Sequence, residues 1–277
     1  MRSGVRIATG IGMLGLAAAL PVAQAVADPW IPPAGDGVTK PMIRFFSGNR
    51  SFPANGFTTG TVPASNETTT QFRITGVQGL GDGFSLEYDL RAARTQTSSY
   101  KHHKTITSTA SGLQDQEIGL NYGLTQTPSF AQSIEFNVIA PTGRTKPSPS
   151  LGTGRWSVEP DYQLGLVHGP FSLSLITGPR VFLDGGATQL RATLYLSVRP
   201  FPRVTLTSEI FVARTIQQAR ALPPGAQGEL YNLLRFGVGA EYRLTQRFRP
   251  FIAYETNVAG PGIHAGNRCT VGVAVHF

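Results

Sequence analysis

Large apolar and polar residues alternate along nearly the whole chain beyond its first thirty positions. In the segment 84–91, Phe, Leu, Tyr and Leu occupy the even positions, whereas Ser, Glu, Asp and Arg occupy the odd ones. A strand places such residues on opposite faces, and a helix would mix them. The same alternation recurs in residues 115–122, 134–138 and 235–243. The pattern predicts an all-β protein.

Counting the alternating segments predicts about twelve strands. Their expected centres are Ile43, Ile74, Tyr88, Leu120, Phe136, Leu164, Leu173, Leu194, Thr207, Val238, Tyr254 and Val273. The first segment fits least well, because the pair Phe45-Phe46 interrupts its alternation. Short turns such as 79–83 and 168–170 alternate with longer expected loops over residues 48–67, 95–112, 141–156, 215–229 and 257–267. Such connections are typical of an up-and-down meander of antiparallel hairpins.

A soluble β-sandwich and a membrane barrel both contain alternating strands, so segment length and the final strand decide between them. The segments run for about 9–12 residues, the length that crosses a bilayer at a tilt, whereas ordinary strands have about 5–6. The last segment alternates to the end of the sequence, with Val271, Val273, Val275 and Phe277 on one face. We therefore expect a transmembrane antiparallel up-and-down β-barrel, whose closure leaves no unpaired strand edge in lipid.

The N-terminus predicts export. Arg2 and Arg6 precede an apolar run over residues 7–22, and Ala25-Val26-Ala27 provides the small residues of a cleavage site. We expect a signal peptide over 1–27, a periplasmic N-terminal extension over 28–39 and an outer-membrane barrel over 40–277. The expected location is the outer membrane of a Gram-negative bacterium. There the terminal aromatic strand, with Val273, Val275 and Phe277, would be the signal read by the barrel-assembly machinery.

Composition alone would suggest an ordinary soluble protein, since the mean hydropathy is −0.06 and 14% of the residues are charged. Sorting the residues by strand face changes that interpretation, because an apolar lipid-facing set separates from a polar interior set. The single cysteine, Cys269, excludes an internal disulfide and a cysteine-based metal site. The sequence also lacks Gly-x-Ser-x-Gly, P-loop and His-Glu-x-x-His motifs. The pair His102-His103 fits a solvated loop better than a metal site, so no catalytic residue, metal or cofactor is expected.

The polar faces of the predicted strands provide candidate residues for the lumen wall. The candidates for selectivity are Arg73, Glu87, Asp89, Arg91, Asp115, Glu117, Glu135, Asp161, Arg191, Glu209, Arg235, Glu241, Arg243 and Glu255. With Arg268 this wall carries six basic and nine acidic residues, a balance of 6 − 9 = −3. Unpaired charges are costly in a narrow interior, so we expect these groups to form a stabilising network. The other interpretation is that some line a selective path; the acidic balance disfavours a wide anion pore.

The expected long loops are basic. They hold Arg50, Lys101, Lys104, Arg144, Lys146, Arg155, Arg180 and Arg220 against Glu67, Asp184 and Glu229, a balance of 8 − 3 = +5. Basic residues bind the phosphates of charged membrane surfaces. We therefore expect these loops to contact outer-membrane lipid and lipopolysaccharide. Nucleic-acid binding does not suit an exported barrel.

Several short motifs point to a known family. They are Pro141-Thr142-Gly143, the run Ser150 to Val158 with its Gly-x-Gly-x-Trp core, Asp161 to Gly165, Gly79 to Asp82 and Gly112 to Glu117. From about Thr68 to the C-terminus the chain resembles the outer-membrane transporter family named for the MetA pathway of phenol degradation. The resemblance implies a porin-like barrel that passes small organic compounds, often aromatic, by passive diffusion. The alternatives are an outer-membrane enzyme at the barrel rim and a structural or adhesive barrel with surface-binding loops.

Overall fold

The computed structural model describes residues 29–53, 57–101, 104–146, 148–220 and 232–277. The expected signal peptide over 1–27 and the pair His102-His103 lie outside these residues. Within the described ranges no helix is long and apolar enough to span a membrane.

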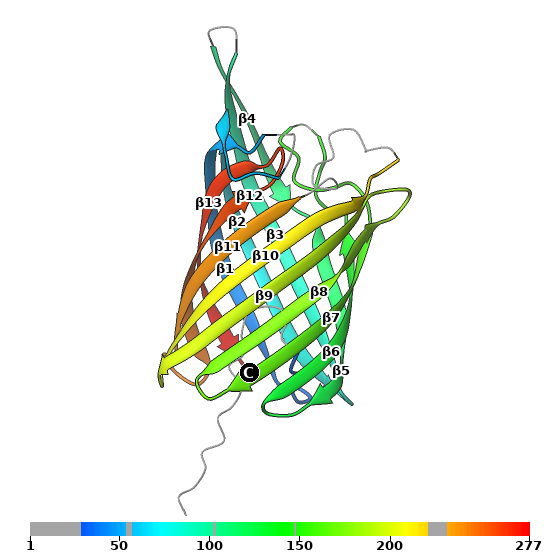
Figure 1. Ribbon diagram of the computed structural model, residues 1–277, viewed down its shortest axis with the longest axis vertical. Helices are drawn as coiled ribbons and strands as arrows, with labels where there is room; N and C mark the ends of the chain where they lie inside the picture. Colours follow the sequence, from blue (N-terminus) through cyan, green and yellow to red (C-terminus); the bar gives the residue numbers. More distant parts are fainter. Residues whose placement is uncertain (1–28, 54–56, 102–103, 147, 221–231) are drawn as a thin grey trace, which may run out of the picture.

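The described residues form thirteen β-strands in one sheet. Figure 1 shows them as a tilted ring, with β4 in a hairpin that rises above one end. The strands are β1 (Gly37–Ser51), β2 (Val62–Gly81), β3 (Phe84–Lys101), β4 (Lys104–Leu113), β5 (Gln116–Gln126), β6 (Phe130–Ala140), β7 (Ser157–His168), β8 (Phe171–Phe182), β9 (Thr188–Phe201), β10 (Val204–Gln217), β11 (Leu233–Tyr242), β12 (Phe248–Ala259) and β13 (His264–His276).

The sheet closes into a barrel because the first and last strands pair. β1 is antiparallel to both β2 and β13, and Arg44 lies opposite Thr270 in the closing pair. Residues 84–89 of β3 pair with β5, and residues 92–101 pair with β4. β4 and β5 therefore occupy a single position in the wall, which has twelve strand positions. The prediction of a twelve-stranded antiparallel barrel is confirmed, and each expected centre lies within a strand.

The wall is interrupted between β4 and β5, at Gln114 and Asp115, and a side chain repairs the gap. The Arg91 backbone N–H donates to Gln116 Oε1 at 2.8 Å, and Gln116 Nε2 donates to the Arg91 carbonyl oxygen at 2.8 Å. The side-chain amide thus takes the place of a neighbouring backbone. Because buried backbone groups need partners, this exchange lets the chain turn from β4 into β5 without opening the wall.

Burial is inverted relative to a soluble protein. Asn121 and Gln163 are fully buried, whereas Ile118 and Phe136 are 53% and 50% exposed. Most strands alternate in this way, with polar residues inside and apolar residues outside. This arrangement is the one expected where lipid covers the outer face and the interior is polar.

Several boundaries differ from the expectations. β1 begins at Gly37 rather than at residue 40, and the Gly37 and Phe277 backbones exchange two hydrogen bonds at the seam. Residues 95–112 are mostly strand, not loop, and β2 already begins at Val62. Both extensions lie beyond the apolar band of the wall. Their residues are mostly polar on both faces, so hydrophobic alternation does not reveal them.

The break in alternation at Phe45-Phe46 also has a structural reason. Phe45 is 50% exposed on the outer face, whereas Phe46 turns inward and its ring lies over Gly266. A Cβ added at Gly266 would lie 2.3 Å from the Phe46 ring. An interior aromatic fits here because the opposing strand carries a glycine.

Residues 29–36 form a strap against the short-turn end of the interior. Trp30 Nε1 donates to the Thr127 carbonyl oxygen at 2.8 Å, and the Gly35 backbone N–H donates to the Gly79 carbonyl oxygen at 3.0 Å. Trp30 packs on Gly165, where an added Cβ would lie 2.3 Å from the indole ring. The N-terminal segment is thus bound to the wall on two sides.

Candidate functional site

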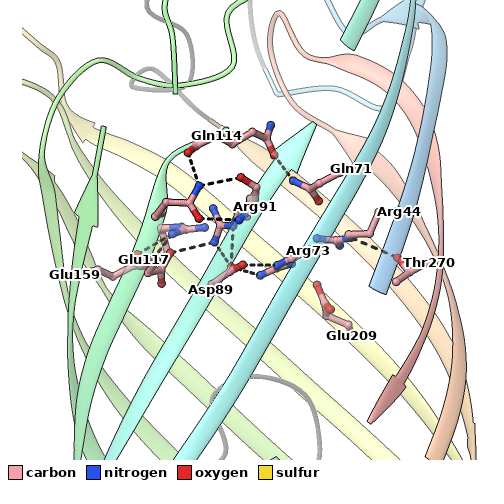
Figure 2. Close-up of polar contacts among 12 residues, drawn as sticks. Arg44, Gln71, Arg73, Asp89, Arg91, Gln114, Glu117, Glu159, Glu209 and Thr270 are labelled. Carbon is pink, nitrogen blue, oxygen red and sulfur yellow. Dashed lines mark hydrogen bonds and ion pairs between the residues drawn. The ribbon is translucent and has the colours of Figure 1, made fainter. Parts of the chain in front are cut away.

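Ion pairs cross the barrel interior as a belt, which begins on β2 and β3. Arg73 and Arg91 flank Asp89, and the Nε atom of each lies 2.8 Å from an Asp89 carboxylate oxygen. Figure 2 shows the three side chains meeting inside the wall. Arg91 also contacts Glu117 of β5 at 3.1 Å. The Asp89 side chain is 4% exposed, so its charge depends on these partners.

The belt continues across β7, β8 and β9. Arg180 of β8 contacts Glu117 at 3.2 Å and also pairs with Glu159 of β7. Arg191 of β9 contacts the same Glu159 carboxylate at 2.8 Å. Arginines and carboxylates therefore alternate from β2 to β9.

A second group of ion pairs lies on β1 and β10 to β13, with Glu255 at its centre. Arg44, Arg268 and Arg235 approach the Glu255 carboxylate to 2.6, 2.9 and 3.2 Å. Arg235 also contacts Glu209 of β10 at 2.7 Å. One buried carboxylate thus holds three guanidinium groups from three strands.

Phe211 of β10 connects the two groups. The guanidinium carbons of Arg191 and Arg235 lie 5.1 and 4.7 Å from its ring centroid. Cation–π contacts of this kind are favourable within about 6 Å. The aromatic ring therefore contacts one cation from each group.

The belt divides the interior into two cavities. The outer vestibule, of about 850 Å³, lies at the long-loop end and is lined in part by residues 149–153 and 261–264. The inner cavity, of about 310 Å³, extends toward the short turns and is lined in part by Lys40, Thr205 and Phe251. Seven residues border both cavities: Arg44, Arg73, Arg91, Arg180, Arg191, Phe211 and Arg235.

Most of the charged residues expected in the lumen do line it. The inner cavity is bordered by Arg73, Glu87, Asp89, Arg91, Glu117, Glu135, Asp161, Arg191, Glu209, Arg235, Glu241 and Glu255. Asp115 borders the outer vestibule instead. Arg243 lies just beyond β11, and its backbone N–H donates to the Arg203 carbonyl oxygen. It borders neither described cavity.

Some of these acids form a separate polar cluster near the inner cavity. Asn121 Nδ2 donates to Glu87 Oε1 at 3.0 Å, and Gln163 Nε2 donates to Glu135 Oε2 at 2.5 Å. The Ser133 hydroxyl donates to Gln163 Oε1 at 3.1 Å. In this cluster side-chain amides connect strands that carry acidic residues, whereas in the belt arginines connect them.

Sequence reasoning missed three members of the belt. Arg44 and Glu159 were not recognised as interior residues, and the placement of Arg180 in an outer loop is wrong, because β8 continues to Phe182. Glu67 was likewise placed in a loop, but it lies on β2, 3.4 Å from His264 Nε2. The available signal was strand parity, since Glu159 lies two positions before Asp161 on the same face.

Asp115 holds the loop over residues 141–156. Its carboxylate accepts hydrogen bonds from the backbone N–H of Gly143 at 3.1 Å, and from the backbone N–H and hydroxyl of Thr153, both at 2.8 Å. Gly152 packs between Gly143 and Asp115, and a Cβ added to it would lie 2.7 Å from the Gly143 Cα. The Gly112–Glu117 and Pro141–Val158 motifs therefore meet in space and fix one wall of the vestibule.

His264 lies at the same end of the barrel. Its Nε2 contacts Glu67, and its Nδ1 has no hydrogen-bond partner among the described residues. Within the described ranges no group of three or more His, Cys, Asp or Glu residues could hold a metal ion.

Comparison with solved structures identifies the class of the fold. An outer membrane channel from Pseudomonas putida F1 superposes with a TM-score of 0.70 at 15% identity, over 92% of this chain and 100% of that one. The translocator domain of the autotransporter NalP from Neisseria meningitidis gives a TM-score of 0.53 at 12% identity, over 89% and 90%. The NanC porin gives 0.51 at 10% identity, over 84% and 98%. The fold is that of an outer-membrane β-barrel.

The family follows from the sequence. Residues 102–271, more than half of the chain, match the family described as "Putative MetA-pathway of phenol degradation". The chain belongs to this family, as its motifs predicted, although the matched span begins later than Thr68. No curated protein matches the sequence.

Proposed function

We propose that the protein is a channel of the bacterial outer membrane through which small organic molecules diffuse passively. The observation that carries the proposal is the divided polar interior, with cavities of about 850 and 310 Å³ on the two sides of one belt. A barrel filled by its own side chains would leave no such space. The family and the fold of the channel from Pseudomonas putida F1 support the same function.

The loop over residues 141–156 would set access from outside. Leu151 of this loop is buried against Ala93 and Ala110, at the base of the β3–β4 hairpin. Asp115 and the close-packed glycines hold the loop from the other side. A wall fixed in this way keeps the vestibule open.

Osmotic swelling of proteoliposomes tests the channel. The full chain, refolded into liposomes, would be diluted into isosmotic phenol, benzyl alcohol or a disaccharide. Because phenol and benzyl alcohol also cross lipid unaided, each rate is measured relative to protein-free liposomes and to liposomes with heat-unfolded protein. We expect the folded protein to accelerate entry of the small aromatic solutes several-fold more than entry of the disaccharide. Equal rates with folded and unfolded protein would overturn the channel.

A further inference from the structure

The belt presents different charges to the two cavities. The residues that border both are six arginines and Phe211, whereas the belt carboxylates, Asp89, Glu117, Glu159, Glu209 and Glu255, border only the inner cavity. Each of these arginines therefore reaches both cavities, whereas its carboxylate partner reaches only the inner one. The floor of the vestibule is a ring of arginines.

The vestibule is consequently basic. Its lining contains Arg44, Arg73, Arg91, Arg180, Arg191, Arg235 and Arg268 against Glu67 and Asp115, a balance of 7 − 2 = +5. Both acids already have partners, Glu67 at His264 and Asp115 in its loop. The inner cavity has seven basic and nine acidic residues, or −2, although it shares six of the same arginines. A molecule that enters from the long-loop end thus meets a positive surface first.

Two of these arginines, Arg44 and Arg73, use only two of their three side-chain nitrogens in hydrogen bonds to other described residues. Arg44 binds Glu255 and Thr270 through Nη2 and Nε, and Arg73 binds Asp89 through the same two nitrogens. A guanidinium carries five N–H donors in a planar fork. The Nη1 group of each lies outside these bonds, and both residues border the vestibule. The N–H groups of a guanidinium form strong, charge-assisted hydrogen bonds with carboxylates.

Phe211 adds an aromatic contact to the same floor. Its ring borders both cavities and lies close to the guanidinium groups of Arg191 and Arg235, so guanidinium planes and a benzene ring are presented together. Aromatic ligands stack on both kinds of surface. Carboxylate recognition and a stacking surface at one level favour a ligand that has both groups.

We propose that the vestibule floor is a binding site for small aromatic carboxylates, with benzoate as the simplest example. This inference rests on the proposed channel and names the class of solute that the channel selects. The carboxylate accepts hydrogen bonds from the Nη1 groups of Arg44 and Arg73, and the ring lies toward Phe211. An anion at this position also reduces the mutual repulsion of the arginines, which a neutral phenol-type solute does not.

The test compares benzoate with benzyl alcohol, a neutral molecule of similar size. Titration calorimetry measures binding to the full chain in detergent, and the swelling assay measures passage. The variant is the double substitution Arg44→Gln with Arg73→Gln. Glu255 then still has Arg235 and Arg268, and Asp89 still has Arg91. Arg203→Gln is the matched control, because Arg203 lies exposed in the β9–β10 turn and borders neither cavity.

We expect benzoate to bind the wild-type chain at least tenfold more tightly than benzyl alcohol. The double variant should lose at least about tenfold of this affinity, as removal of hydrogen bonds to a charged group predicts, and Arg203→Gln should not. Equal binding of both solutes, or benzoate binding unchanged in the double variant, would overturn the site while passage of benzyl alcohol still supported the channel. Benzoate binding that depends on the two arginines, without passage of any solute, would support the site and refute the channel.

Discussion

Asp89 holds two guanidinium groups, which gives a single residue a large effect on stability. In Asp89→Asn the side-chain volume is kept, but Arg73 loses its only carboxylate partner among the described residues, and Arg91 keeps Glu117. Breaking a buried pair typically costs about 3–5 kcal/mol. Arg73 is 20% exposed, so water compensates part of the loss and we expect about 2–3 kcal/mol.

Urea unfolding in detergent micelles, followed by tryptophan fluorescence, measures this loss. Asp82→Asn is the matched control, because Asp82 lies exposed in the β2–β3 turn with a φ of 51° that asparagine also adopts. The control should unfold within about 0.5 kcal/mol of the wild-type chain. If Asp89→Asn had the same free energy of unfolding as the control, the belt would not stabilise the barrel.

At the scale of elements, strand parity predicted most of the wall, and the exceptions share one cause. Along β6 and β7 a single alternation assigns each residue to lipid or interior, so Glu135 and Asp161 could be placed from the sequence. Beyond the apolar band both faces of a strand meet water. The upper part of β3, from Thr95 to Ser99, therefore carries polar residues in succession, and the sequence predicts a loop there.

The loop over residues 141–156 provides a prediction at this scale. In Gly152→Ala the new Cβ would lie 2.7 Å from the Gly143 Cα and from its carbonyl oxygen, and 2.2 Å from Asp115 Oδ1. The clash with the Gly143 backbone cannot be removed by rotating a side chain. We therefore expect the loop to detach from Asp115. Trypsin should then cleave after Arg144 or Arg155 at least several-fold faster than in the wild-type chain.

Gly60→Ala controls for the substitution itself, because the nearest atom to its added Cβ, Thr58 Oγ1, lies at an ordinary 3.5 Å. Cleavage in the control should follow the wild-type rate. Unchanged cleavage in Gly152→Ala would mean that the glycine contact does not hold the loop.

At the scale of the whole molecule, closure creates the belt, and closure was the part of the site least accessible from sequence. Arg44 and Glu255 are 211 positions apart. They meet because β1 pairs with β13, and β12 is the next strand in the wall. Parity assigns a residue to the interior, but strand tilt and stagger decide which residues share a height. The sequence could therefore predict a charged wall, but not the ring of arginines across it.

A substitution at the closing seam, where β1 pairs with β13, can distinguish an effect on assembly of the barrel from an effect on its stability. The Phe277 backbone pairs with Gly37, whereas its side chain is 50% exposed. Phe277→Ala keeps the backbone bonds and removes an aromatic group that we propose is read by the barrel-assembly machinery. We expect the amount of folded, heat-modifiable protein in cells to fall several-fold, while the purified variant refolds in detergent and unfolds within about 1 kcal/mol of the wild-type chain.

Phe248→Ala is the matched control for this comparison. Phe248 is 47% exposed at the same end of the barrel and lies opposite Val275 in the β12–β13 pair. Its loss removes a similar apolar surface from lipid but leaves the terminal strand intact. If both variants lost the same amount of folded protein in cells, lipid contact would explain the effect. A loss confined to Phe277→Ala, with unchanged unfolding in detergent, indicates that the terminal aromatic group acts during assembly.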